Sequence, residues 1–429
     1  MLIGLPALRD AGDAMTVETF DHTTEAHAAH WREIYAEARE HQPVIRSMAH
    51  GGYYVLTRHA DIIAALRNHQ AFSSERSWHE DGTDKGLGVA IPHQPVRVGI
   101  LEMDPPEHLK YRRLLTPWFT RQAIDRGRER IGQIATWAID RVIEKGECDI
   151  VADLAGPFQA IAILDLIGVP LDRWAAYADV AERMVRQTED RGEGAAWMRE
   201  DLRREVERQR IEPLDGLIAG LNNAVVDGEA LSVDWATELV NMLLLGGEGT
   251  TIATIAHMLR HLHERPVDRA RIAADAALLP SAVDEMMRFH APSPGLARTV
   301  VQEVEVGGHT FVPGDRVLLS YASGNFDSTV FAAPEIPDIT RSPNPHLAFG
   351  GGVHRCPGAL LASANAEMFL AEVLRRTPAY QITDLHAYER IPLTNGYFSM
   401  RMTFTPGARE GADQGDLPHL TAPRVRPAG

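Results

Sequence analysis

The sequence predicts a mainly α-helical protein with small β-sheets. Between about residues 104 and 289, apolar residues recur at helical spacing and only short loops interrupt them. Short alternating runs separated by turn residues occur on either side of this region. Because no repeat and no linker divides the chain, we expect one domain over 16–405 after a flexible N-terminus at 1–15. The stretch 406–429 is rich in Gly, Pro and Asp, which predicts a disordered tail.

Composition narrows the classes of function. The 429-residue chain carries a formal net charge of −16, and an acidic chain repels phosphate backbones, so nucleic-acid binding is not expected. The two cysteines, Cys148 and Cys356, are too few for a disulfide framework or a four-cysteine zinc site. The N-terminus lacks a basic region followed by an apolar one, and no run of about 18 apolar residues stands out. We therefore expect a cytoplasmic protein without a membrane anchor.

The strand signals are local hairpins. Residues 44–48 and 53–57 alternate around a pair of glycines. Residues 304–311 do the same around a second glycine pair, and a Pro-Gly-Asp turn then leads into a short strand at 317–320. These runs predict the small sheets beside the helical region.

Residues 232–264 predict the longest helix, roughly 50 Å at 1.5 Å per residue. Its middle contains Gly246, Gly247 and Gly249, which together cost about 3 kcal/mol of helix propensity. Such a cost indicates close approach to a flat group or a local break in the hydrogen bonds of the helix. Glycine-mediated helix packing is the alternative interpretation.

The most informative segment, 346–358, reads His-Leu-Ala-Phe-Gly-Gly-Gly-Val-His-Arg-Cys-Pro-Gly. Pro357 is suited to the first turn of a helix, and apolar spacing predicts that helix over 359–376. Cys356 therefore stands at a helix N-terminus, where free N–H groups and the helix dipole stabilise a thiolate. The glycines at 350–352 let the backbone bend tightly and approach a flat group. A purely structural cysteine would not account for this combination.

This segment resembles the cysteine loop of cytochromes P450, whose pattern is F-G-x-G-x-H-R-C-x-G. The matching residues are Phe349, Gly350, Gly352, His354, Arg355, Cys356 and Gly358. The resemblance extends over about 16–405. It implies the cytochrome P450 fold, a triangular prism with haem b (heme b, iron protoporphyrin IX) between the long oxygen-binding helix and the helix after the cysteine loop. It also implies that Cys356 is the axial thiolate and metal ligand.

The resemblance assigns roles to the other residues of the cysteine loop. Phe349 is expected to pack beside the sulfur, and His354 to bond a haem propionate. Gly358 is expected to belong to the same cofactor-binding loop. These roles follow from the family pattern and not from spacing.

Two further motifs match the family. Glu285 and Arg288 are three residues apart on a predicted helix and can form an ion pair, which the resemblance implies is a structural pair below the haem. His108 and Arg112 share a helix face after an Asp-Pro-Pro sequence. With Arg298 and the histidine of the cysteine loop, they are expected to satisfy two buried propionates. Taken alone, each pair is also compatible with a solvated surface.

The glycine-bearing helix departs from the family at one position. The resemblance implies that Thr250 is the catalytic hydroxyl beside bound oxygen, preceded by an acidic residue. Here Gly249 precedes the threonine and Glu248 lies one residue earlier. One residue turns a helical side chain by about 100°. We therefore expect Glu248, through a local distortion, or a water chain to replace the usual acid.

The resemblance implies a monooxygenase that hydroxylates or epoxidises a hydrophobic or aromatic small molecule with O2. The expected substrate pocket includes Met242, Leu243, Gly246, Leu296, Tyr397 and Phe398. These residues are mostly apolar, which is typical of small-molecule sites. The loop 78–98 is expected to contribute. Arg76, His79 and Arg97 are candidates for binding a substrate carboxylate, and solvated loop charges are the alternative interpretation.

Electrons must come from another protein, since the sequence has no phosphate-binding loop or dinucleotide fingerprint. In soluble bacterial family members the donor is usually a ferredoxin with its ferredoxin reductase, and NAD(P)H is the ultimate source. A basic cluster is a candidate docking surface for an acidic partner, although a solvated helix face is an equally good interpretation. Its members are Lys110, Arg112, Arg113, Arg121, Arg126, Arg128 and Arg130.

Three alternatives remain at this point. Gly249 in the acid position suggests a peroxide-driven haem-thiolate enzyme. A non-catalytic haem or ligand-binding protein is the second alternative. A zinc site at His354 and Cys356 is the weakest, because no further cysteine is nearby.

Overall fold

The computed structural model describes residues 20–77, 87–93, 97–186, 190–411 and 416–427. The expected flexible segment 1–15 lies outside these residues. About 53% of the residues are helical, which confirms the mainly α fold class. The helices are α1 (Glu25–His41), α2 (His59–Arg67), α3 (Glu107–Leu115), α4 (Arg121–Asp140), α5 (Gly156–Ile167), α6 (Trp174–Arg186), α7 (Arg191–Ile211), α8 (Leu217–Asn222), α9 (Val233–Gly247), α10 (Gly249–Glu264), α11 (Pro266–Ala274), α12 (Leu279–His290), α13 (Tyr321–Gly324) and α14 (Ala359–Arg376).

The strands form small sheets, as predicted. The main sheet has five strands in the order β1-β2-β10-β7-β3, and a three-stranded sheet has the order β11-β12-β4. The antiparallel pairs β1–β2 and β8–β9 confirm the predicted hairpins. The strands are β1 (Val44–Ser47), β2 (Tyr53–Leu56), β3 (Phe72–Ser73), β4 (Glu147–Asp149), β5 (Val225–Val226), β6 (Glu229–Ala230), β7 (Gly295–Val300), β8 (Val304–Val306), β9 (His309–Phe311), β10 (Arg316–Ser320), β11 (Gln381–Ala387) and β12 (Tyr397–Thr403).

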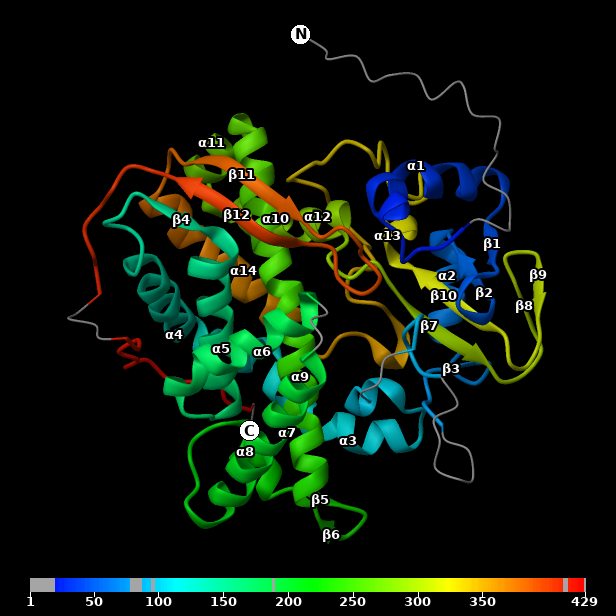
Figure 1. The fold of residues 1–429 in the computed structure, drawn as a ribbon, viewed down its shortest axis with the longest axis horizontal. Coiled ribbons are helices and arrows are strands. Elements are labelled where there is room, and N and C mark those ends of the chain that lie inside the picture. The colour runs from blue at the N-terminus through cyan, green and yellow to red at the C-terminus, as the bar shows by residue number, and fades with distance from the viewer. Residues whose placement is uncertain (1–19, 78–86, 94–96, 187–189, 412–415, 428–429) are drawn as a thin grey trace.

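The long helices and the main sheet occupy opposite sides of the molecule. Figure 1 shows α4, α5, α9, α10 and α14 gathered on the left and the five-stranded sheet with α1 and α2 on the right. The largest buried apolar cluster lies among the long helices and includes Trp137, Phe158 and Phe369. The rings of Phe158 on α5 and Phe369 on α14 have centroids 4.6 Å apart. This core holds α5 and α14 close to the central helices α9 and α10.

The predicted helix 232–264 is broken at Glu248. α9 ends at Gly247 and α10 begins at Gly249, with Glu248 at φ −82° and ψ −68° between them. The N–H of Ile252 donates to the Glu248 carbonyl and opens α10. The break falls among the three glycines, where the sequence predicted either a break or a close approach.

The helix after the cysteine loop has the bounds that the sequence predicted. Pro357 and Gly358 form a turn, and α14 runs from Ala359 to Arg376. Cys356 therefore lies just before the N-terminus of this helix, where the sequence predicted it. α14 packs against α10, so the cysteine loop leads directly into the layer beneath the broken helix.

The C-terminal segment differs from the predicted disordered tail. In Figure 1 its described part runs beside α4 and α5. Arg130 donates to the carbonyls of Leu420 and Ala422, at 3.3 and 2.8 Å. Val425 is buried against Gly127, where a Cβ would lie 2.4 Å from its Cγ2. The segment has the composition of a disordered tail, but its backbone carbonyls accept hydrogen bonds from α4 and Val425 packs against that helix.

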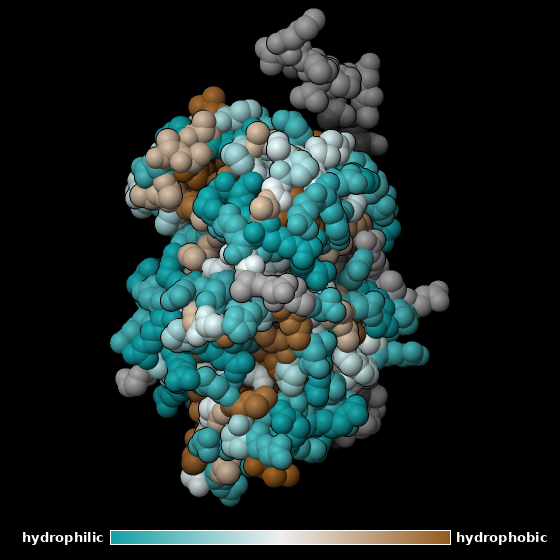
Figure 2. Space-filling view, turned by 90° about the vertical axis from the view of Figure 1, so that its left-hand side faces the viewer, coloured by the Kyte–Doolittle hydropathy of each residue, from teal (hydrophilic) through white to brown (hydrophobic). Residues whose placement is uncertain are grey.

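Two helical stretches are long and apolar enough to cross a membrane, Ile150–Ile167 and Val233–Glu264. This differs from the expectation that no such run stands out. Polar residues interrupt both stretches, so neither is a continuous apolar run although the mean hydropathy of each is high. In the most apolar 18 residues of each stretch, 72% and 67% respectively are buried inside the protein, as in the core helices of a folded domain. Figure 2 shows that the face over α4 is mostly hydrophilic, with apolar side chains in small groups.

Candidate haem-thiolate site

The cysteine loop has a backbone that requires glycine. The N–H of Cys356 donates to the Phe349 carbonyl at 2.9 Å and closes the loop. Gly350 and Gly352 both have φ of +63°, in the left-handed region. A Cβ on Gly352 would lie 2.0 Å from the backbone oxygen of Leu66 on α2. The loop therefore reaches this conformation only with glycine at 352.

The thiol of Cys356 lies in a buried setting with nearby positive charge. Burial raises the pKa of Cys356, while the Gly358 N–H and the charges of Arg112 and Arg355 oppose that rise. The Gly358 N–H thus stabilises a thiolate as expected for a position before a helix, although desolvation of the charged sulfur acts more strongly in the opposite direction. A metal ion bound to the sulfur reverses this balance, since coordination deprotonates a thiol.

Two histidines predicted to bind propionates come together from distant parts of the chain. The rings of His108 on α3 and His354 in the cysteine loop have centroids 4.4 Å apart. Nδ1 of His108 and Nε2 of His354 are buried and have no hydrogen-bond partner among the described residues. Burial, and then the charge of Arg112, lowers the pKa of His108 to about 4. Burial, and then the charge of Arg298, lowers the pKa of His354 to about 2.

The two arginines of the predicted set lie beside these histidines. Arg112 donates to the Arg355 carbonyl at 2.6 Å, and buried Arg298 donates to the Ala297 carbonyl at 2.7 Å. Neither guanidinium has a carboxylate partner at ion-pair distance in the part of the chain that the structure describes. A buried guanidinium without an anion is unfavourable, and so is a buried imidazole N–H without an acceptor. The two propionates of a haem fit this set of donors.

The broken helix offers an open side formed by glycine. No atom lies within 4 Å of a Cβ built on Gly246 or Gly249. The Thr250 hydroxyl donates to the Gly246 carbonyl at 3.2 Å. Glu248 is only 3% exposed, and burial raises its pKa to about 8. Its carboxyl has no hydrogen-bond partner among the described residues, so it is mainly protonated at neutral pH.

Glu285 and Arg288 form the expected ion pair, and the pair is completely buried. The two Arg288–Glu285 contacts are both 2.8 Å. Arg288 also donates to the carbonyls of Asn325 and Pro334. Glu285 accepts from Arg341 at 3.0 Å. The pair thus fixes α12 to the segment that leads into the cysteine loop.

Comparison with known proteins decides the family. The family model described as cytochrome P450 matches residues 177–377. A steroid C26-monooxygenase of Mycolicibacterium smegmatis is 31% identical over 88% of this chain and 93% of its own length. The chain belongs to the cytochrome P450 family. A P450 of this kind is a haem-thiolate monooxygenase that binds haem b, as the sequence predicted.

Other P450 relatives agree. The cyclomarin C epoxidase CymV of Salinispora arenicola is 32% identical over 86% of this chain and 94% of its own length. A solved structure of a Mycobacterium marinum cytochrome P450 with pseudoionone has a TM-score of 0.82 and 29% identity, covering 90% of this chain and 98% of that one. The fold of this chain is therefore the cytochrome P450 fold.

The predicted pocket residues of this P450 have different surroundings. Met242 and Leu243 are buried on α9, next to the open side at Gly246. Tyr397 is 2% exposed, and its hydroxyl lies 3.0 Å from both Arg260 and His257 further along α10. That hydroxyl is held by a polar cluster and not offered to a ligand. Leu296 is half-buried on β7 opposite Leu319, and Phe398 packs against Tyr388.

The loop region 78–98 is only partly described, and His79 lies outside the described residues. Arg76 is buried and forms an ion pair with Glu102, with a closest N–O distance of 3.6 Å. Glu102 also accepts from the N–H groups of Val89 and Val98. Arg76 is therefore part of an internal network, which argues against the suggestion that it holds a substrate carboxylate.

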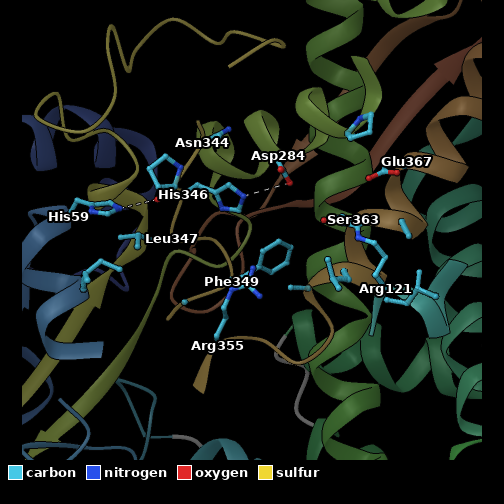
Figure 3. A pocket seen from close by; sticks show the side chains of 18 of the residues that line it. His59, Arg121, Asp284, Asn344, His346, Leu347, Phe349, Arg355, Ser363 and Glu367 are labelled. Carbon is cyan, nitrogen blue, oxygen red and sulfur yellow. Dashed lines mark hydrogen bonds and ion pairs between the residues drawn. The ribbon is translucent and has the colours of Figure 1, made fainter. Parts of the chain in front are cut away.

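Sequence reasoning missed a hollow on the cysteine-loop side of this P450. The hollow has a volume of about 780 Å³. Four arginines from α2, α4 and the cysteine loop line it, namely Arg67, Arg121, Arg128 and Arg355, together with the carboxylates of Asp125, Asp284 and Glu367. Figure 3 shows Arg121, Arg355 and Phe349 around it, with the His346–Asp284 contact on another side. The sequence showed that the chain has a cluster of basic residues, but it did not show which arginines lie together beside the cysteine loop.

The predicted basic cluster does not form one free patch. Arg126 and Arg130 face the C-terminal segment, where Arg126 donates to the Pro427 carbonyl. Lys110 is paired with Glu107 and Asp227. Only Arg121 and Arg128 of the cluster line the hollow.

Proposed function

We propose that this P450 inserts one oxygen atom from O2 into a bulky hydrophobic molecule, with electrons from a separate ferredoxin and its reductase. The observation that carries the proposal is a glycine-built cysteine loop beside Arg112 and Arg298, which have no carboxylate partner among the described residues. Relatives named as a steroid monooxygenase and an epoxidase support an apolar substrate, as do Met242 and Leu243 on α9. We place the enzyme in the cytoplasm, where a ferredoxin system would reduce it.

Each residue in the proposed mechanism has a defined task. Cys356 would bind the haem iron through its sulfur, and the donors of His108, Arg112, Arg298 and His354 would hold the propionates. Bound haem supplies the iron chemistry that activates O2. Phe349 and Gly358 complete the loop around the sulfur.

Proton supply is assigned to Thr250 and Glu248. Because the Thr250 hydroxyl donates its hydrogen to the Gly246 carbonyl, its oxygen is free to accept a further hydrogen bond. The buried Glu248 carboxyl keeps its proton up to a pKa of about 8. It is thus a proton reservoir one residue away from the usual acid position. Ordered water would connect it to Thr250.

The test begins with the absorption spectrum of dithionite-reduced protein under CO. A Soret band at the thiolate-ligated position supports Cys356 as ligand, and a band typical of histidine ligation refutes it. Steroids and smaller terpenoids are then titrated for the low-spin to high-spin shift. Turnover is measured with O2 plus a ferredoxin system and, separately, with peroxide. Product from peroxide alone would favour the peroxide-driven alternative, and tight binding without product the ligand-binding one.

We also propose that an acidic ferredoxin docks over the hollow beside Cys356. Arg121 and Arg355 provide positive charge there, and half-exposed Leu360 provides an apolar contact. Arg121→Glu should slow reduction by the donor about tenfold or more at low salt, because electrostatic steering is lost. Arg126→Glu is the matched control, since it lies on the same helix but faces the C-terminal segment. Equal rates for both variants would refute docking at this hollow.

A further inference from the structure

Helix α5 contacts the break in the oxygen-side helix through a buried amide. Gln159 is 2% exposed, and its Nε2 donates to the Gly247 carbonyl at 3.0 Å. Ile163 lies one turn further along α5, and a Cβ on Gly247 would be 3.2 Å from its Cδ1. The end of α9 is therefore pressed against one face of α5.

The Gly247 carbonyl is the acceptor that the break releases. In a continuous helix it would accept from the N–H of Thr251, four residues on. Here α10 opens with the bond from Ile252 to Glu248, and Gly247 instead accepts from the Thr251 hydroxyl at 3.0 Å and from Gln159. A buried carbonyl without a partner is unfavourable. Gln159 therefore stabilises the broken helix relative to the continuous one.

A second amide fixes the orientation of the first. Asn365 on α14 is 1% exposed, and its Nδ2 donates to Oε1 of Gln159 at 3.1 Å. With its oxygen held by Asn365, Gln159 must direct its nitrogen toward Gly247. The chain of contacts joins three helices, and α14 is the helix that follows the Cys356 loop.

We infer that Gln159 and Asn365 are positioning residues that hold the helix break open and thereby set the places of Glu248 and Thr250. The inference rests on the proposed roles of those two residues in proton supply. Neither amide contacts the open side at Gly246 and Gly249. They act through the Gly247 carbonyl.

The test is Gln159→Leu in the haem-loaded protein, followed by hydrogen exchange of residues 245–252 and by coupling of O2 use to product. We expect amide hydrogen exchange at 249–251 to slow about fivefold, because the Gly247 carbonyl, released by Gln159, then accepts from the Thr251 N–H. Fivefold corresponds to about 1 kcal/mol, the net contribution of one hydrogen bond. Coupling should fall while the thiolate CO band is kept. Asn365→Leu should act in the same direction with a smaller effect.

Gln209→Leu is the matched control. Gln209 is also buried and donates Nε2 to a glycine carbonyl, that of Gly168, but far from the break. Unchanged or faster exchange at 249–251 in Gln159→Leu, or the same change in the control, overturns the inference. Slower exchange with intact coupling would support the positioning of the break and refute the proton roles of Glu248 and Thr250.

Discussion

The raised pKa of Glu248 predicts a pH-dependent cost to stability that Glu248→Gln removes. Burial moves this pKa from 4.5 to about 8. Between these values the folded protein keeps the proton and the unfolded chain loses it. Stability from this group is therefore greatest below pH 4.5 and falls as pH rises, by about 1.4 kcal/mol per unit, until the folded pKa is passed. Between pH 5.5 and 7.5 the free energy of unfolding of the wild type should fall by about 2 to 3 kcal/mol through this group, and that of Glu248→Gln should not.

The assay is urea unfolding of both haem-loaded proteins at pH 5.5 and 7.5. The quantity compared is the change with pH of the difference between variant and wild type, so that all other titrating groups cancel. An increase of about 2 to 3 kcal/mol in favour of Glu248→Gln is expected. A difference that stays constant with pH would refute the conclusion that the Glu248 carboxyl is neutral in the folded protein.

The same variant tests the catalytic role. Wild-type coupling of O2 to product should decline as pH rises through about 8, because the Glu248 carboxyl ionises. Glu248→Gln should already be poorly coupled at pH 7 and show no such decline. If its coupling equals that of the wild type at both pH values, Glu248 is not the proton source.

Three further outcomes follow from buried contacts. Arg288→Met removes one of the two cationic partners of the fully buried Glu285 carboxylate, which then keeps only Arg341, and should lower the free energy of unfolding by about 3 kcal/mol, measured by denaturant unfolding. Gly352→Ala requires a positive φ and places a Cβ against the Leu66 carbonyl, so the CO spectrum should show loss of the thiolate band although the protein remains helical by circular dichroism. Asp165 accepts from Arg130 on α4 and from Arg424 in the C-terminal segment, so Asp165→Asn should weaken the attachment of that segment. Limited proteolysis should then cut the segment faster while the thiolate CO band remains.

Local features of the site were readable from the sequence. The cysteine loop is contiguous, and its glycines report directly the backbone angles that the turn requires. The glycines of the long helix likewise indicated a break, since their cost in helix propensity is a local quantity. The Glu285–Arg288 pair could be predicted because residues three apart on a helix share a face.

Only the tertiary structure decided what lies beside each of these elements. The contact of His108 with His354, and of Gln159 with Gly247, depends on how distant helices pack, which no local pattern contains. Desolvation also depends on packing, so the sequence could not show that burial raises the pKa of Cys356. The C-terminal segment has the composition of a disordered tail, but α4 supplies partners for its backbone. The sequence by itself determined the family and predicted Cys356 as the iron ligand, because both depend on one contiguous motif. Packing decided the burial, charge and partners of the groups around that cysteine.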